Sequence, residues 1–203
     1  EQLTALPAEA MTTMKPAQLG AMKPTTMAAL APEQMAALPA TALTQMKSTQ
    51  AAALPSAAIA EMKSAQVGAM PAAAVGGFKA EQLTALPAEA MTTMKPAQLG
   101  AMKPTTMAAL APEQMDALPA TALRQVSDKQ LGAISSEAMK SLDVAQIGAL
   151  PKEAFKGMKA EQASAMSPDQ ARAMTPAKVA EMPAAVRAIV NEKKTQPQPP
   201  ADS

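Results

Sequence analysis

A strict eight-residue period runs through this chain, and the phase of its apolar residues limits the possible folds more than any other feature. From Pro7 the sequence divides into 22 full octads that end at Met182, with a partial octad before them. Every Met and every Leu falls at position five or position eight of its octad, and the Pro residues before the tail fall at positions one and two. Positions five and eight are therefore expected to form the core, and positions one and two the turns.

The spacing of the core positions excludes the simplest elongated folds. Apolar residues follow one another at intervals of 3 and 5, so a continuous α-helix would rotate its stripe by about 80° per octad and lose a common face. A β-solenoid would place positions five and eight on opposite faces. One short helix of about 6–7 residues per octad, with its apolar pair at i and i+3, fits the pattern. Such helices are unstable alone. The sequence therefore predicts an all-α, repetitive α-solenoid.

A second period, twice as long as the octad, appears at position four, which holds Gln in every second octad. The column comprises Gln2, Gln18, Gln34, Gln50, Gln66, Gln82, Gln98, Gln114, Gln130, Gln146 and Gln162. The predicted unit is thus a 16-residue superperiod of two non-equivalent helices, which we expect to form one coil. We favour a structural ladder whose amides satisfy backbone groups at the turns. A polar ligand-binding stripe is the alternative interpretation.

The period also predicts the domain organisation. Residues 1–182 form the octad-repeat solenoid, residues 183–194 a C-terminal capping helix with Val186, Ile189 and Val190 at helical spacing, and residues 195–203 a Pro/Gln-rich disordered tail or linker. Residues 1–35 recur identically at 81–115, which indicates internal duplication. The chain starts in mid-repeat without an initiator Met, so we expect a processed chain or an excerpt.

Composition removes most catalytic and binding chemistry. The chain has no Cys, His, Trp or Tyr and a net charge of +1, so we expect no enzyme, no catalytic or metal-binding residue, no cofactor and no nucleic-acid partner. The 18 Met could suggest copper, but Met interchanges with Leu, Ile, Val and Phe at the same positions, as core residues do. Apolar runs are too short for a transmembrane segment, and a soluble chain is expected.

The octads themselves resemble a known class of repeat. Segments such as AEQLTALP, PEQMAALP, SDKQLGAIS and VAQIGALP are similar to the "AQIAALTT"-type arrays of large bacterial surface and secreted proteins, often described as adhesion or haem-utilisation proteins. Pro, Lys and Met often replace the Thr and Leu of those arrays here. The resemblance implies an extracellular or cell-surface stalk or adhesin segment. No haem ligand carries over, because the chain has no His, Cys or Tyr.

These observations predict a non-enzymatic structural spacer or stalk segment of a bacterial surface or secreted, adhesin-like protein. Two helices per coil and about eleven coils would give a rod on the order of 100 Å. The alternative is a solenoid scaffold that binds a peptide or protein along one face. A partner of either would be another protein or a surface receptor. Handedness, the number of helices per coil and the oligomeric state do not follow from the sequence.

Overall fold

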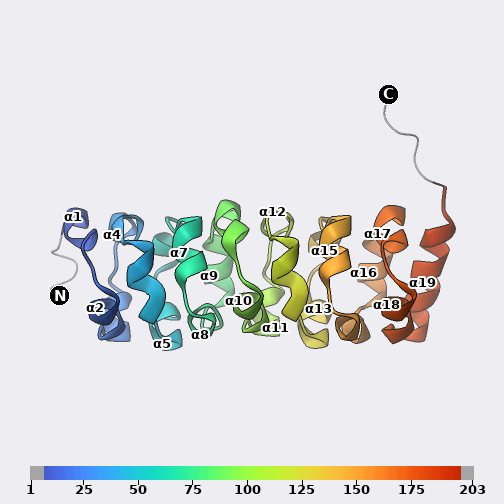
Figure 1. The fold of residues 1–203 in the computed structure, drawn as a ribbon, viewed down its shortest axis with the longest axis horizontal. Helices are drawn as coiled ribbons and strands as arrows, with labels where there is room; N and C mark the ends of the chain where they lie inside the picture. The colour runs from blue at the N-terminus through green and yellow to red at the C-terminus, as the bar shows by residue number, and fades with distance from the viewer. Residues whose placement is uncertain (1–6, 198–203) are drawn as a thin grey trace, which may run out of the picture.

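The protein is an elongated solenoid of short helices (Figure 1). The computed structural model describes residues 7–197, and all of the regular structure in that range is helical. Each octad from Pro7 to Met182 contributes one helix, so the eight-residue period of the sequence is also the period of the structure. The predicted repetitive α-solenoid is confirmed.

The helices of the octads hold four to six residues, slightly fewer than the expected 6–7. Four-residue helices are α1 (Ala8–Met11), α3 (Pro24–Met27), α5 (Ser48–Ala51), α6 (Ser56–Ile59), α8 (Ala72–Val75) and α11 (Pro104–Met107). Five-residue helices are α2 (Pro16–Gly20), α10 (Pro96–Gly100), α12 (Pro112–Asp116), α14 (Ser136–Lys140) and α17 (Pro168–Arg172). Six-residue helices are α4 (Pro32–Ala37), α7 (Ser64–Ala69), α9 (Ala80–Ala85), α13 (Asp128–Ala133), α15 (Val144–Ala149), α16 (Ala160–Ala165) and α18 (Pro176–Glu181). Four octads form 3₁₀ helices instead: η1 (Ala40–Gln45), η2 (Ala88–Thr93), η3 (Ala120–Gln125) and η4 (Lys152–Gly157).

Backbone geometry at position one explains where each helix begins. Position one is the N-cap of every helix and has extended backbone, as at Lys15 (φ −89°, ψ 152°) and Pro39 (φ −66°, ψ 142°). Pro at position two then occupies the first helical residue, where no amide donor is needed, as at Pro16. Pro at position one fixes the N-cap φ, and the residue before it is held extended. Where proline is present it therefore favours this helix start, and octads without it, such as the one from Lys47 (φ −91°, ψ 157°), begin with the same extended N-cap.

Backbone hydrogen bonds at position eight explain why the helices are short. The N–H of the position-eight residue donates to the carbonyl of position five, as from Met46 to Leu43 at 3.1 Å and from Leu54 to Ala51 at 3.1 Å. This bond spans three residues, so it tightens the last turn into 3₁₀ geometry and ends the helix. The chain then becomes extended through positions eight and one.

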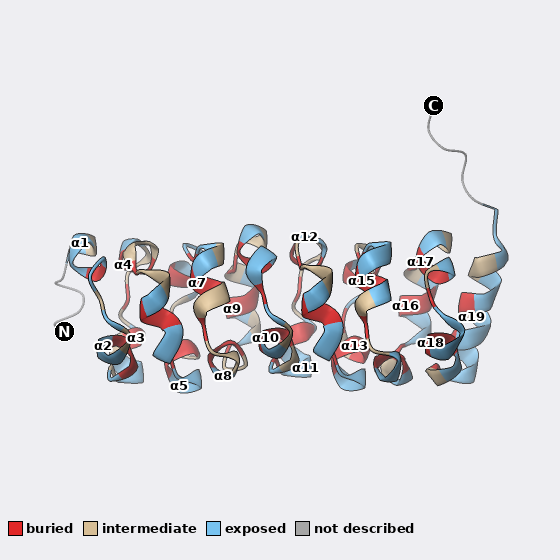
Figure 2. Ribbon diagram, in the orientation of Figure 1, coloured by how far each residue is buried: buried red, intermediate tan, exposed pale blue. Residues whose placement is uncertain are grey.

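The core is continuous and runs the length of the solenoid (Figure 2). Residues at positions five and eight are buried in almost every octad, from Met11 to Met182, and the two Phe residues, Phe78 and Phe155, lie among them. From Gln34 onward position four is buried as well, whether it holds Ala, as at Ala42, or Gln, as at Gln50. The octad therefore faces the interior with three residues, one more than the apolar pattern predicts.

One turn of the solenoid holds more helices than expected. Each helix contacts the helix three octads further along, as α1 contacts α4, α2 contacts η1, and η4 contacts α18. Hydrogen bonds also link octads that are four apart, as between Gln50 and Leu19. A turn therefore contains between three and four octads. Each 16-residue unit does form two helices, but the expected two-helix coil is wrong. In a coil of two helices the chain would have to reverse its direction at every link between helices. In the observed coil the chain changes direction at each link by only a third to a quarter of a full turn.

A longer helix closes the C-terminal end. Helix α19 (Ala184–Thr195) has Pro183 as its N-cap and packs against α16, α17 and α18, with Val186 and Val190 buried (Figure 1). The tail predicted from residue 195 begins at the last residue of this helix, and residues 198–203 lie outside the described range.

Candidate functional site

The glutamines at position four, here called the glutamine ladder, are the polar feature that the sequence singles out. Most of their side chains are buried, and Gln50 and Gln98 are only 1% exposed. Because burial removes the amide from water, each of these side chains needs hydrogen-bond partners within the protein. Gln2 lies outside the described residues, and Gln18 at the N-terminal end is exposed. The structure brings the others to the contacts between successive turns.

The carbonyl oxygen of each ladder glutamine caps its own helix. It accepts a hydrogen bond from the backbone N–H at position one, as from Lys47 to Gln50 Oε1 at 2.8 Å. Lys and Ala at position one have no side-chain acceptor, so the reciprocal half of a capping box falls to the glutamine. The same bond occurs at 2.8–3.0 Å in Gln18, Gln34, Gln50, Gln66, Gln82, Gln98, Gln114, Gln130, Gln146 and Gln162.

The amide nitrogen of the same side chain binds the preceding turn of the solenoid. Gln50 Nε2 donates to the carbonyl oxygens of Leu19 at 2.8 Å and Met22 at 2.7 Å, at positions five and eight of the octad four before its own. These carbonyls belong to the C-terminal end of a helix, where intrahelical donors run out. Such pairs of bonds, at 2.6–3.0 Å, are made by Gln50, Gln66, Gln82, Gln98, Gln114, Gln130, Gln146 and Gln162.

These bonds arrange the glutamines in two columns. Because each glutamine from Gln50 onward binds the octad four earlier, its column neighbours lie four octads away along the chain. One column runs Gln18, Gln50, Gln82, Gln114, Gln146, and the other runs Gln34, Gln66, Gln98, Gln130, Gln162. From Gln50 onward, each glutamine therefore joins the start of one helix to the end of another on the preceding turn.

Two further residues belong to the ladder, and sequence reasoning missed both. Gln170 stands at position four outside the 16-residue period, and its Nε2 donates to Lys140 O at 3.0 Å and Leu142 O. Its signal was the capping-box sequence SPDQ at 167–170. Lys178 occupies the position where the period places the next Gln, and its Nζ donates to Ile147 O at 2.8 Å and Gly148 O at 2.7 Å. No sequence signal distinguishes Lys178 from the exposed lysines except its octad position.

Lys178 is the ladder member with perturbed electrostatics. Its side chain is 7% exposed, and burial lowers the pKa of its amine from the ordinary value of 10.5. The two carbonyl oxygens and the ring of Phe155, whose centroid lies 5.7 Å from Nζ, favour the charged form in compensation.

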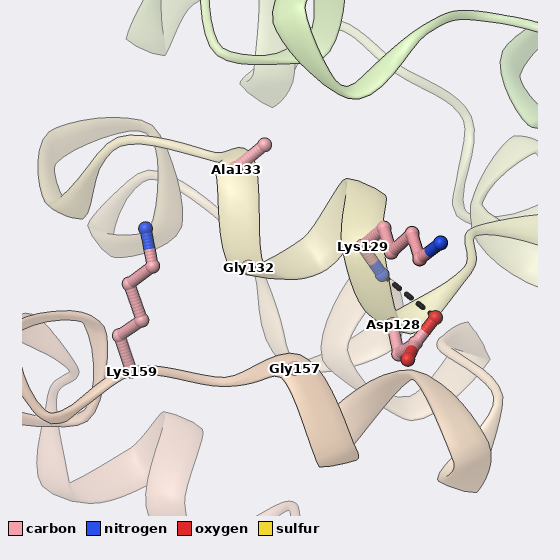
Figure 3. A pocket seen from close by; sticks show the side chains of 6 residues that line it. All are labelled: Asp128, Lys129, Gly132, Ala133, Gly157 and Lys159. Carbon is pink, nitrogen blue, oxygen red and sulfur yellow. Dashed lines mark hydrogen bonds between the residues drawn. The ribbon is translucent and has the colours of Figure 1, made fainter.

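Shallow hollows on the surface occur where glycine leaves out a side chain (Figure 3). One is lined by Asp128, Lys129, Gly132, Ala133, Gly157 and Lys159. The Asp128 carboxylate there accepts a hydrogen bond from the Lys129 N–H at 2.8 Å. A second hollow lies ten octads earlier, with Ser48 and Gly77 at the places of Asp128 and Gly157. Thr49 and Ala52 replace Lys129 and Gly132 there. Among residues 7–197 no cluster of three or more acidic, His or Cys side chains could hold a metal ion.

No protein-family model matches the sequence, and no curated protein shows significant similarity to it. The resemblance to "AQIAALTT"-type arrays therefore stays a prediction that rests on the octad motif. Of the helices between residues 7 and 197, none is both long and apolar enough to cross a membrane.

Proposed function

We propose that this chain is a non-enzymatic structural spacer, a stalk segment of a repetitive bacterial surface or secreted, adhesin-like protein. The observation that carries the proposal is the glutamine ladder, whose buried side chains bond each turn of the solenoid to the turn before it. The same interactions recur from Gln50 to Gln170. A repeated contact of this kind supports length and cohesion, because each added turn is held as the previous one is.

The surface supports the same proposal. Residues 1–35 and 81–115 are identical at exposed as well as buried positions. Duplication of whole octads lengthens a spacer without requiring any new site, whereas a binding scaffold usually varies its surface over a constant core. The extracellular or cell-surface location rests on the resemblance of the octads alone.

Localisation and reach can both be tested. In the organism of origin, an antibody against the chain should label intact cells or detect the chain in the culture medium, and labelling only after lysis would contradict the surface role.

For the spacer role, chains lengthened by four and by eight further octads should increase in maximum dimension by equal steps in small-angle scattering. A dimension that does not grow with added octads would rule out a spacer.

The second candidate is a peptide- or protein-binding scaffold, and the repeated hollows at Gly77 and Gly157 favour it. Here the test is a pull-down with the chain against Lys129→Glu/Lys159→Glu, which changes the charge beside one hollow. A stoichiometric partner that the variant loses would place the scaffold ahead of the spacer. Retention of every captured protein by the variant would leave the hollow without a binding role.

A further inference from the structure

The exact internal duplication provides a comparison of one sequence in two surroundings. Each residue from Pro7 to Met35 has a twin of the same type 80 positions later. In the second copy, the helices η2, α10 and α11 are covered by α7, α8 and α9 of the preceding turn. In the first copy, the corresponding helices α1 and α2 lie at the N-terminal end of the solenoid (Figure 1).

Burial differs between the twins in a consistent direction. Met94 and Met102 are 2% and 3% exposed, whereas their twins Met14 and Met22 are only partly buried. The other pairs behave alike: Ala10 and Gln18 are exposed, whereas Ala90 and Gln98 are each 1% exposed. We call Ala10, Met14, Gln18, Met22 and Thr26 the N-terminal end face.

Hydrogen bonds in the second copy show which groups contact the same surface in the interior. Gln98 Nε2 donates to Val67 O at 2.7 Å and to Met70 O at 2.8 Å, and Thr106 Oγ1 donates to Phe78 O at 3.1 Å. The twin donors, Gln18 Nε2 and Thr26 Oγ1, have no hydrogen-bond partner among residues 7–197. The end face therefore presents the same apolar contacts and the same donors as an interior contact between turns.

We propose that the N-terminal end face is a docking surface for a further octad turn, one with the sequence character of residues 55–80. The structure supplies the complementary partner, because the identical surface at η2 and α10 is already covered by that segment. The occupant must offer helix-end carbonyl oxygens at positions five and eight, as Val67 and Met70 do.

A second copy of this chain does not fit that requirement. Helix α19 covers the C-terminal end, where Lys194 Nζ donates to Met174 O at 2.8 Å and Arg187 Nη2 donates to Met182 O at 3.1 Å. Two of the position-eight carbonyls at that end are therefore already bonded, and α19 packs over α16 and α17, where an end face would dock. Two end faces against each other would place amide donors opposite amide donors. The inference stands independently of the spacer role, since it concerns only what this surface binds.

The test adds such a turn to the full chain. Residues 49–80 are added before Glu1, so that the new junction repeats the natural sequence across 80 and 81. We expect amide hydrogen exchange over residues 11–22 to slow by about tenfold or more, toward the rates of residues 91–102. The matched controls are an extension of the same length and composition in scrambled order, and the natural extension carrying Met22→Asp, neither of which should slow exchange.

Exchange over residues 11–22 that the natural extension leaves unchanged, or slows no more than the scrambled one, would overturn the proposal. Sedimentation of the unextended chain decides on the other occupant. We expect a monomer; a dimer that Met22→Asp dissociates would assign the end face to a second copy and would also overturn the proposal.

Discussion

At the scale of single residues, the residue at position four determines whether an octad makes side-chain hydrogen bonds to the preceding turn. Ala there, as at Ala42 and Ala58, is buried without any polar demand. Gln at the same place is buried at the cost of desolvating an amide, and the cost is offset because both ends of the amide are bonded. Within residues 7–197 no buried side-chain nitrogen or oxygen lacks a hydrogen bond. The ladder is thus a fully satisfied polar network inside an apolar core, the condition under which such networks stabilise a fold.

Removal of one ladder glutamine should therefore be costly. In Gln82→Ala, the Lys79 N–H and the carbonyls of Ala51 and Leu54 lose their bonds to the side chain. We expect the free energy of unfolding to fall by about 1–3 kcal/mol, because buried backbone groups lose their partner. Urea denaturation followed by far-ultraviolet circular dichroism measures it. Gln45→Ala, at an exposed position seven, is the control and should change the midpoint little; equal effects would refute the role of the ladder.

Lys178 predicts a specific pH dependence. Its pKa is lowered in the folded state, whereas the unfolded chain has the ordinary value of 10.5. In the window from the lowered pKa up to 10.5 the unfolded state binds more protons, so this residue makes stability rise with pH. Lys178→Gln removes the titration and restores the ladder residue.

Urea denaturation of both proteins from pH 7 to pH 11 tests this dependence. The stability of the natural protein should gain on that of Lys178→Gln as the pH rises, and at pH 7 the variant should be at least as stable. Lys129→Gln, which removes an exposed lysine, should instead give a curve parallel to that of the natural protein. Parallel curves for Lys178→Gln as well would mean that the amine is not desolvated.

At the scale of elements, the helices are too short to be stable alone, and close contact between them replaces length. Glycines at positions six and seven permit the closest approaches. A Cβ built on Gly76 would lie 2.5 Å from Ala101 O, and one on Gly157 would collide with Asp128 O. In both cases the obstructing atom is backbone, which cannot rotate away.

Two glycine substitutions should have opposite signs. Gly157→Ala forces η4 away from α13, so we expect the thermal midpoint to fall by several degrees, as overpacking of a tight contact does. Gly148→Ala adds a Cβ that meets nothing within 4 Å, and alanine favours the helix by about 0.5–1 kcal/mol over glycine. The midpoint of that variant should rise. Calorimetry of the two single variants checks both, and a loss of stability in Gly148→Ala would contradict the packing described.

Much of this element-level structure could be predicted from the sequence. The octad phase placed Pro39 and Lys47 at turns and Leu43 and Met46 in the core, because proline geometry and apolar spacing act within a few residues. Helix length was overestimated, because nothing in the apolar pattern encodes the bond from position eight to position five. The apolar pattern also does not reveal that position four is buried, because that position holds Ala, as at Ala42, or a polar residue, as at Gln50.

At the scale of the whole molecule, the number of octads per turn is the property that the sequence conceals. It depends on small angles between neighbouring helices, which accumulate over a turn. The 16-residue period marks which octads carry a glutamine, but the bonded carbonyls lie 28 and 31 residues earlier, as for Gln50 with Met22 and Leu19. A 16-residue period shows that every second octad is equivalent in sequence, but tertiary packing determines which octads contact one another.

This arrangement predicts which internal deletions the solenoid tolerates. Removal of residues 47–78 takes out four whole octads and joins Met46 to Lys79. Gln82 then occupies the place of Gln50 and can bind Leu19 O and Met22 O, so the register of contacts across three and four octads is retained. Removal of residues 51–78 takes out nearly the same length but shifts the downstream octads by half a period, which turns core positions five and eight outward.

We expect the first deletion to shorten the maximum dimension from small-angle scattering by about a sixth while a single cooperative melting transition remains. The second should lower the thermal midpoint by about 5 °C or more, or split the transition in two, because the core is interrupted at the junction. Helical content per residue, from circular dichroism, distinguishes a shortened solenoid from a damaged one. Similar stability of the two deletions would mean that the octad phase does not hold the turns together.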